Sequence, residues 1–191
     1  MGVFIIIGEP DAHEHSATRA AQYMSMILGM SLANFTILHV AVGLIGIGSG
    51  LVVLAGLILR KRLDVWTNLF LATTIATSVT GFFFPFERLL PSHIVGLLSL
   101  AVLGLALFAR GARHLEGPWL RAFAISSCVA LYLNAFVLIA QLFNKVPALK
   151  AMAPTQSESP FVLAEGGLLL LFGTLGTIAA RKAASKVALT A

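Results

Sequence analysis

The sequence predicts an all-α polytopic membrane protein: a bundle of five transmembrane helices with the N-terminus outside and the C-terminus in the cytoplasm. Three observations lead to this fold class, namely the composition, the length of the apolar stretches and the placement of the basic residues. Of the 191 residues, 58% are hydrophobic and 11% are charged, whereas a soluble domain carries about 25% charged residues. Water is therefore not the main solvent of this chain.

Five apolar stretches approach the length of about 20 residues that a helix needs to cross a bilayer. They are Asn34–Leu59, Val65–Phe84, Ser92–Phe108, Leu120–Phe143 and Phe161–Ala180. Because they take up most of the chain, we expect an N-terminal segment over residues 1–33, one bundle over 34–182 and a cytoplasmic tail over 183–191. The longest connection, Asn144–Pro160, is expected to be an outer loop.

The basic residues favour one side of the predicted membrane, and this bias sets the orientation. Nine of them fall on one side: Arg60, Lys61, Arg62, Arg110, Arg113, Arg121, Arg181, Lys182 and Lys186. The other four fall on the opposite side: Arg19, Arg88, Lys145 and Lys150. The positive-inside rule places the first set in the cytoplasm. Helix ends and lipid headgroups explain the net charge of +5, so we expect a lipid bilayer and no nucleic acid as the partner.

The first apolar region is too long for one straight crossing. Tyr23–Leu59 would form about 55 Å of helix, against a hydrocarbon core of about 30 Å. We therefore expect a break at Ser31–Asn34, with Ala17–Met30 lying on the outer surface as an interfacial amphipathic helix. Farther along the chain, Asp64 is expected to cap the second span, and Pro91 to stand in the first turn of the third.

One face of the first span combines a histidine with glycines. The residues at positions i, i+4, i+7 and i+11 of this face are His39, Gly43, Gly46 and Gly50. A glycine stripe lets a second helix approach closely, so His39 should point into the bundle. It could form a hydrogen bond to a neighbouring helix, or it could be a metal ligand, a haem ligand or a proton-handling group.

His93 opens the third span on the same outer side, at a depth similar to that of His39. Two histidines on different spans could be the axial ligands of a haem b, and with a glutamate they would also match a zinc ligand set. His39 and His93 are therefore the candidate cofactor-binding residues, although His93 could equally be an interfacial residue in contact with water. Cys128, the only cysteine, falls inside an apolar stretch, so we expect a packing role and no intrachain disulfide.

Polar residues of the fourth and fifth spans suggest a ligand pocket. Asn134 and Gln141 share one face of span four, and buried amides in lipid ordinarily hydrogen-bond between helices because they are costly when unpaired. Glu165 lies about one turn inside the hydrocarbon edge, where an acidic residue indicates function or an ion pair. It could accept hydrogen bonds from Gln141 or pair with Lys145 or Arg88. The candidates for an outward-facing pocket are therefore Asn134, Gln141, Glu165 and Arg88.

Two strings near the end of the chain carry a family resemblance. Residues Ala130–Leu149 read ALYLNAFVLIAQLFNKVPAL, and Ala153–Glu158 read APTQSE. With the turn Thr80–Pro85, the chain resembles a family of small bacterial polytopic membrane proteins that has no assigned activity, over about residues 38–161. The family motif ends in two prolines where this chain has Ser159 followed by a single proline. The resemblance implies the bacterial inner membrane and no particular reaction.

We therefore expect an integral membrane protein whose outward-facing polar cluster binds a small ligand, an ion or a partner subunit without catalysis of its own. One alternative is a haem b electron-transfer protein with His39 and His93 as axial ligands. The other is a structural accessory subunit of a membrane complex, since glycine-rich helix faces favour assembly. The expected partners are the bilayer, other membrane subunits or a second copy of the chain.

Overall fold

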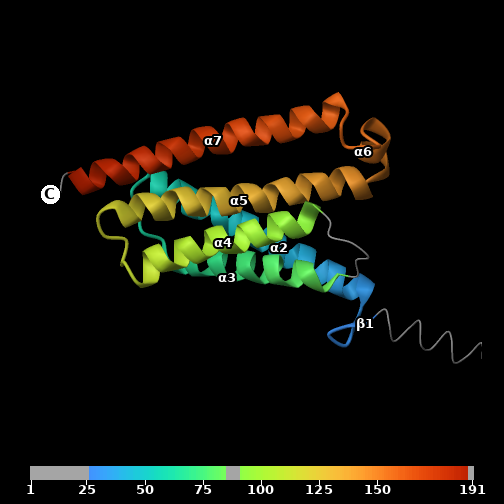
Figure 1. The fold of residues 1–191 in the computed structure, drawn as a ribbon, viewed down its shortest axis with the longest axis horizontal. Coiled ribbons are helices and arrows are strands. Elements are labelled where there is room, and N and C mark those ends of the chain that lie inside the picture. Colours follow the sequence, from blue (N-terminus) through green and yellow to red (C-terminus); the bar gives the residue numbers. More distant parts are fainter. Residues whose placement is uncertain (1–25, 85–90, 189–191) are drawn as a thin grey trace, which may run out of the picture. The chain divides into compact units, whose positions relative to one another are not determined.

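The computed structural model describes residues 26–84 and 91–188. They fall into two compact units, and the chain passes from the first to the second between Leu38 and His39. All long elements are helices (Figure 1).

The described part of the first unit begins with a short hairpin, where β1 (Met26–Ile27) pairs antiparallel with β2 (Met30–Ser31). The turn consists of Leu28 at φ 53° and Gly29 at φ 78°, and two consecutive residues with positive φ reverse the chain tightly. The interfacial helix expected over residues 17–30 is therefore wrong at Met26–Met30. Residues 17–25 of that expected helix lie outside the described residues.

α2 (Leu32–Ile58) begins directly after the hairpin. The Ser31 hydroxyl oxygen accepts the backbone N–H of Asn34 at 3.3 Å, which satisfies one of the free donors at the start of a helix. α2 therefore begins within Ser31–Asn34, the range where a break was expected.

The other helices belong to the second unit. They are α3 (Asp64–Thr80), the 3-10 helix η1 (Gly81–Phe83), α4 (Pro91–Gly111), α5 (Pro118–Lys145), α6 (Pro147–Met152) and α7 (Ser159–Ala188). Each of the five predicted spans corresponds to one long helix. The short α6 lies within the stretch that was expected to be an outer loop.

Among the described residues, four helices are long and apolar enough to cross a membrane: Leu32–Ile58, His93–Gly111, Pro118–Lys145 and Ser159–Ser185. By length and composition they make the chain a helical, multi-pass membrane protein. α3, with 17 residues, is not among the four.

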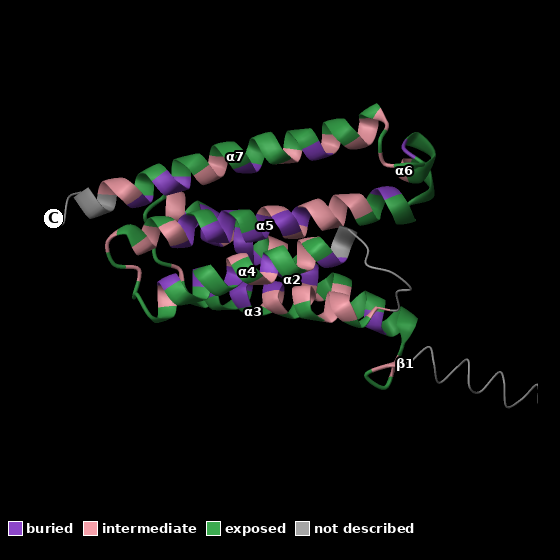
Figure 2. Cartoon of the chain, viewed as in Figure 1, coloured by how far each residue is buried: buried purple, intermediate pink, exposed green. Residues whose placement is uncertain are grey.

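α5 lies at the centre of the second unit, packed against α7 and α4, while α3 packs against α4 (Figure 1). Small side chains stand at these contacts: Ala106 of α4, Ala124 of α5 and Ala179 of α7 are fully buried. Buried residues gather along α5, whereas most of α7 is exposed (Figure 2). Helices pack closely through small residues in lipid, where no hydrophobic force drives them together.

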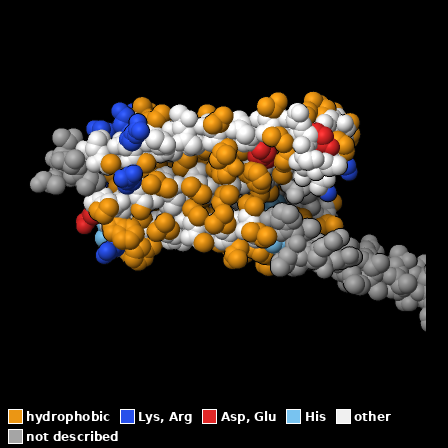
Figure 3. All heavy atoms as spheres, turned by 45° about the horizontal axis from the view of Figure 1, so that its top comes forward, with side chains coloured by type: hydrophobic (Ala, Val, Ile, Leu, Met, Phe, Trp, Pro, Cys, Tyr) orange, Lys and Arg blue, Asp and Glu red, His pale blue; other side chains and the backbone are white. Residues whose placement is uncertain are grey.

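Exposed apolar side chains cover the outer side of the bundle. On α7, Leu163 is 73% exposed and Leu170 is 75% exposed. Figure 3 shows hydrophobic side chains over the middle of the visible face, while Lys and Arg gather at the end where α7 finishes. A surface this apolar is stable in lipid and would be an interaction surface or an aggregation hazard in water.

Cys128 lies in the contact between α5 and α7. Its thiol, 5% exposed, is 3.4 Å from the carbonyl oxygen of Phe172, and a Cβ atom at Gly176 would stand 2.8 Å from the sulfur. The thiol is free and fills a gap between two helices, as expected for a packing role.

Of the two predicted helix starts, one is confirmed and the other is wrong. Pro91 begins α4, as expected. Asp64 does not cap α3: Leu63 holds the capping position, with no side-chain cap bond. The Asp64 carboxylate instead accepts a hydrogen bond from Arg110 at 3.1 Å, because an arginine from α4 offers a charged partner that an isolated helix lacks.

Candidate functional site

The sequence-predicted site residues that the structure describes lie on four helices, and those that are at least partly buried occupy three separate environments. His39 contacts Thr80 at the end of α3, and His93 contacts Phe82 of η1. Asn134 lies where α5 meets α2, and Glu165 lies where α7 meets α5.

His39 forms an interhelical hydrogen bond. Its Nδ1 atom is 2.8 Å from Oγ1 of Thr80, whose hydroxyl donates to the carbonyl oxygen of Ala76 at 2.7 Å. Because the threonine proton is already committed, Oγ1 accepts and Nδ1 of His39 carries the proton, which leaves Nε2 with a free lone pair. The imidazole also stands edge-on to the Phe84 ring, with centroids 5.1 Å apart. The hydrogen-bonded alternative for His39 is thus present.

His93 is buried, with 7% of its surface exposed. Its ring packs against Phe82 with centroids 5.6 Å apart, and a Cβ atom at Gly96 would stand 3.3 Å from that same phenylalanine. His39 and His93 therefore contact one short segment, Thr80–Phe84, through different residues of it.

The fit of a metal or a haem can be judged from these contacts. No three His, Cys, Asp or Glu side chains within residues 26–84 and 91–188 come together as metal ligands, so His39, His93 and Glu165 do not form a three-ligand set. Each imidazole lies against a phenylalanine, so a haem placed between the histidines would require Phe82 and Phe84 to move. The arrangement is not that of a preformed haem site, which needs an apolar slot between its axial ligands.

Asn134 joins α5 to the glycine face of α2. Its side-chain Nδ2 atom donates to the carbonyl oxygen of Gly43 at 3.4 Å. A Cβ atom at Gly46 would stand 3.2 Å from that nitrogen and 3.0 Å from Oγ1 of Thr74. Thr74 is 1% exposed, and its hydroxyl has no hydrogen-bond partner among the described residues. The glycine stripe therefore faces the bundle, as predicted, and Asn134 acts there as an interhelical hydrogen-bond donor.

Glu165 differs from His39 and Asn134 because its carboxylate forms no hydrogen bond within the described residues. The residue is 8% exposed, and neither carboxylate oxygen forms a hydrogen bond with any part of the chain that the structure describes. Two aromatic pairs of α5 and α7 flank it along the interface: Phe143 with Phe161 at 5.4 Å, and Tyr132 with Phe172 at 6.2 Å. Glu165 is thus a carboxyl group enclosed between two apolar contacts.

The remaining two pocket candidates do not reach Glu165 within the described residues. Gln141 is exposed, and the hydrogen bond that it could donate to Glu165 is absent. Arg88 lies outside the described residues. Glu165 also forms no ion pair with Lys145, since the single ion pair between described residues joins Arg110 to Asp64.

Sequence reasoning missed the turn that precedes α7. The Glu158 carboxylate accepts the backbone N–H of Thr155 at 3.2 Å, the Thr155 hydroxyl at 2.9 Å and the backbone N–H of Ser157 at 3.1 Å. Slight desolvation raises the pKa of Glu158, but these hydrogen bonds outweigh it and hold the pKa below its ordinary value. Gln156 ties the turn to α5 by donating to the carbonyl oxygen of Ala140 at 2.6 Å. The short spacing of Thr155, Ser157 and Glu158 was the available signal.

No protein-family model, curated protein or solved structure matches the chain.

Proposed function

We propose that this chain is a multi-pass membrane protein that binds a small cation or cationic ligand, without catalysis of its own, at an outward-facing site centred on Glu165. The observation that carries the proposal is the carboxyl group of Glu165, buried and without a hydrogen-bond partner among the described residues. An acidic side chain at membrane depth is costly unless a proton, a cation or hydrogen-bond donors accompany it.

The contrast with the other polar groups favours binding over a structural role. His39 and Asn134 have interhelical partners, Thr80 and Gly43, and these bonds account for both residues as structural contacts. Glu165 forms no such bond and no ion pair with any described residue. A bound cation would supply the missing partner.

The outward orientation of the Glu165 site requires five membrane spans. α3 must therefore cross the membrane in addition to the four long apolar helices. α3 with 17 residues and η1 with three together extend about 32 Å, which matches a hydrocarbon core of about 30 Å. Four threonines of α3 donate their hydroxyls to carbonyl oxygens four residues earlier: Thr67, Thr73, Thr77 and Thr80. Hydroxyls satisfied in this way can enter lipid, so the polar composition of α3 is compatible with spanning.

Cysteine accessibility tests the proposed orientation, in which the N-terminus is outside and the C-terminus is cytoplasmic. In a Cys128→Ala background, Lys150→Cys is expected to react with an impermeant maleimide added to intact cells, while Lys182→Cys is expected to react only after permeabilisation. The reverse pattern would overturn the orientation. Labelling of both positions in intact cells would instead mean that α7 does not cross the bilayer.

Carbodiimide labelling tests the Glu165 site. Dicyclohexylcarbodiimide reacts with protonated carboxyl groups in apolar surroundings, so mass spectrometry should find its adduct at Glu165 and not at Glu158, whose carboxylate is hydrogen-bonded in the turn before α7. A cation that binds Glu165 should slow this labelling. Glu158→Gln is the matched control, because it removes one carboxylate outside the bundle and should leave the adduct unchanged.

Thermal stability identifies the cation. Purified protein is titrated with Na⁺, K⁺, Ca²⁺ and small quaternary ammonium ions, and a ligand at about 100 times its Kd stabilises the fold by about 2.7 kcal/mol. We expect one of these to raise the unfolding temperature of the native chain and of Glu158→Gln, but not of Glu165→Gln. The same rise in all three proteins, or no adduct at Glu165, would refute the proposed function.

Two alternatives remain proposals of lower rank. A haem b held by His39 and His93 is favoured only by the free lone pair on Nε2 of His39, and a Soret band that disappears in His39→Ala and His93→Ala would support it. A structural subunit of a bacterial inner-membrane complex, or a homo-oligomer, is favoured by the open glycines of α7, since a Cβ atom at Gly166, Gly167 or Gly173 would meet nothing within 4 Å. It would be supported if Glu165→Gln changed assembly, for example on size-exclusion chromatography, and bound no less cation.

A further inference from the structure

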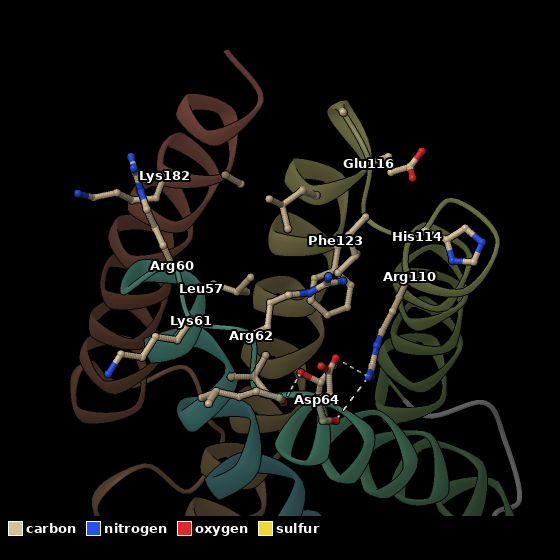
Figure 4. A pocket seen from close by; sticks show the side chains of 17 residues that line it. Leu57, Arg60, Lys61, Arg62, Asp64, Arg110, His114, Glu116, Phe123 and Lys182 are labelled. Carbon is tan, nitrogen blue, oxygen red and sulfur yellow. Dashed lines mark hydrogen bonds and ion pairs between the residues drawn. The ribbon is translucent and has the colours of Figure 1, made fainter. Parts of the chain in front are cut away.

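A cavity of about 460 Å³ opens at the end of the bundle opposite the Glu165 site. Its walls come from the segment between α2 and α3, the segment between α4 and α5, the first turn of α5 and the end of α7. Figure 4 shows Arg60 and Lys182 on one side of the cavity and Arg110 on the other, with Arg62 extending between them.

The cavity carries an excess of positive charge. Five lining residues are cationic, namely Arg60, Lys61, Arg62, Arg110 and Lys182, against two acidic ones, Asp64 and Glu116. Asp64 already pairs with Arg110 at 3.1 Å, and Arg60 donates a hydrogen bond to Ser185. Arg62 has no side-chain hydrogen bond or ion pair with any described residue. Its guanidinium therefore remains available to an anion.

The floor of the same cavity is apolar. Val53 and Phe123 are nearly fully buried beneath it, and Leu57 and Leu120 also line it. A ligand that fits must therefore present an anionic group to the rim and an apolar part to the floor.

The start of α5 adds a second attraction for anions. Gly117 takes the position before the helix at φ 51° and supplies no side-chain cap, and both it and Leu120 line the cavity. Pro118 has no N–H, and the N–H of Trp119 donates to the carbonyl oxygen of Glu116 at 3.0 Å, so it is chiefly the helix dipole that places partial positive charge there. A phosphate group is stabilised by such a helix start when cationic side chains surround it.

Membrane orientation alone does not explain the arrangement. The positive-inside rule requires basic residues on the cytoplasmic side, and Arg121 and Arg181 meet it from exposed positions outside the cavity. It does not require unpaired arginine and an uncapped helix start around an apolar hollow. That combination suits a ligand that carries a phosphate ester at one end and an apolar chain at the other.

We propose that this cavity binds the phosphate of an anionic phospholipid, with Arg62 and the start of α5 holding the phosphate and the apolar floor contacting the start of the acyl chains. Because phosphate contacts of arginine are charge-assisted, Arg62 is the residue whose loss matters most. The proposal does not depend on Glu165.

Lipid titration followed by native mass spectrometry tests the site on the full chain in detergent. Short-chain phosphatidylglycerol is compared with phosphatidylcholine of the same chain length. We expect phosphatidylglycerol to bind saturably and more tightly. Arg62→Gln should weaken it about tenfold or more, as loss of a charged hydrogen bond does, and Arg62→Lys should recover part of the affinity.

Arg121→Gln is the matched control, because it removes one positive charge from the same end of the bundle without touching the cavity. We expect it to change the affinity less than about twofold, the effect of weakening the general field alone. Equal weakening by Arg62→Gln and Arg121→Gln would overturn the proposal, as would equal binding of the two lipids. Unchanged helical content and a monodisperse elution profile confirm that each variant is folded.

Glycerol 3-phosphate and inorganic phosphate form the last arm of the test. If only the lipid binds with a dependence on Arg62, the ligand is a membrane headgroup. If the soluble phosphates bind as tightly with the same dependence, the site accepts phosphate from solution and the acyl chains contribute nothing. Absence of any Arg62-dependent binding in both arms contradicts the assignment.

Discussion

At the scale of single residues, the glycines of α2 are not equivalent. A Cβ atom at Gly50 would stand 2.7 Å from Leu131 and 2.8 Å from Phe70, whereas one at Gly48 would meet nothing within 4 Å. Leu131 and Phe70 are each 1% exposed, so neither can move aside without disturbing the core. Gly50 therefore sets how closely α2 approaches α3 and α5.

We expect Gly50→Ala to destabilise the protein by about 1–3 kcal/mol, the usual cost of overpacking a core. Gly48→Ala should be neutral or stabilising by about 0.5–1 kcal/mol, because alanine is the better helix former and the site is open. Unfolding by SDS titration, followed by circular dichroism, measures both. A loss of stability in Gly48→Ala as large as that in Gly50→Ala would contradict the packing argument.

The sequence predicts which helix faces the site residues share, but not which side chains they contact. Helical spacing correctly places His39, Gly43 and Gly46 on a face that meets other helices, because that spacing is a property of one helix. It does not predict that Glu165 lacks a partner, since the partner depends on which helices are neighbours. Gln141 and Lys145 share the predicted depth of Glu165, yet neither pairs with it, because depth alone does not bring two helix faces together.

At the scale of elements, the turn before α7 is held by one carboxylate. The pKa of Glu158 lies below its ordinary value, so its hydrogen bonds stabilise the turn fully above that ordinary value and are lost as the pH falls through the lowered pKa. The backbone amides of Thr155 and Ser157 report this directly, because they donate to the carboxylate.

We expect the NMR shifts of the Thr155 and Ser157 amides to titrate together on acidification, and this titration to vanish in Glu158→Gln. The amide of Ala153 bonds to the carbonyl oxygen of Leu149, so it is the internal control and should not follow. A titration that persists in Glu158→Gln would assign the effect to another group.

Long helices are predictable from this sequence, and short elements are not. An apolar run long enough to span a membrane can only be helical in lipid, so each of the five runs forms one long helix, although α3 ends earlier than expected, at Thr80, and α7 later, at Ala188. The hairpin at Met26–Ser31 depends on positive φ at Leu28 and Gly29, and α6 begins at Pro147 after a single extended residue. Such local backbone choices leave no periodic apolar pattern to detect.

At the scale of the whole molecule, the outer surface of the bundle is matched to lipid. Leu170, near the middle of α7, is 75% exposed, and Leu59, at the cytoplasmic end of α2 in the proposed orientation, is 65% exposed. In water, the two positions would tolerate a charge equally well. In a bilayer the two positions differ in depth, so the same substitution should have different effects at them.

We expect Leu170→Arg to reduce the amount of membrane-inserted protein, since arginine at the centre of a spanning helix costs about 2.5–3.5 kcal/mol. Leu59→Arg should insert normally, because its charge reaches the interface. Carbonate extraction followed by immunoblotting measures the inserted fraction. Equal insertion of both variants would mean that α7 does not cross the bilayer.

Composition and charge bias predict the membrane bundle, because they sum over the whole chain. The cavity at the basic end was not predicted, since it depends on how two short connections fold back over the helix ends. Residues with positive φ shape both connections: Arg60 in one, and His114 and Leu115 in the other. These residue types do not ordinarily favour positive φ, so the sequence does not predict the two turns.

The reaction rate of the buried Cys128 thiol reports how often α5 and α7 separate. Its sulfur is enclosed between α5 and α7 beside Phe172 and Gly176, so a small thiol reagent reaches it only while the two helices are apart. The rate at which the reagent modifies Cys128 in the unaltered protein therefore measures the separation of α7 from α5, just as amide hydrogen exchange measures local opening. If cation binding at Glu165 holds α7 against α5, the same rate slows as the cation is added, and occupancy can be followed without any engineered label.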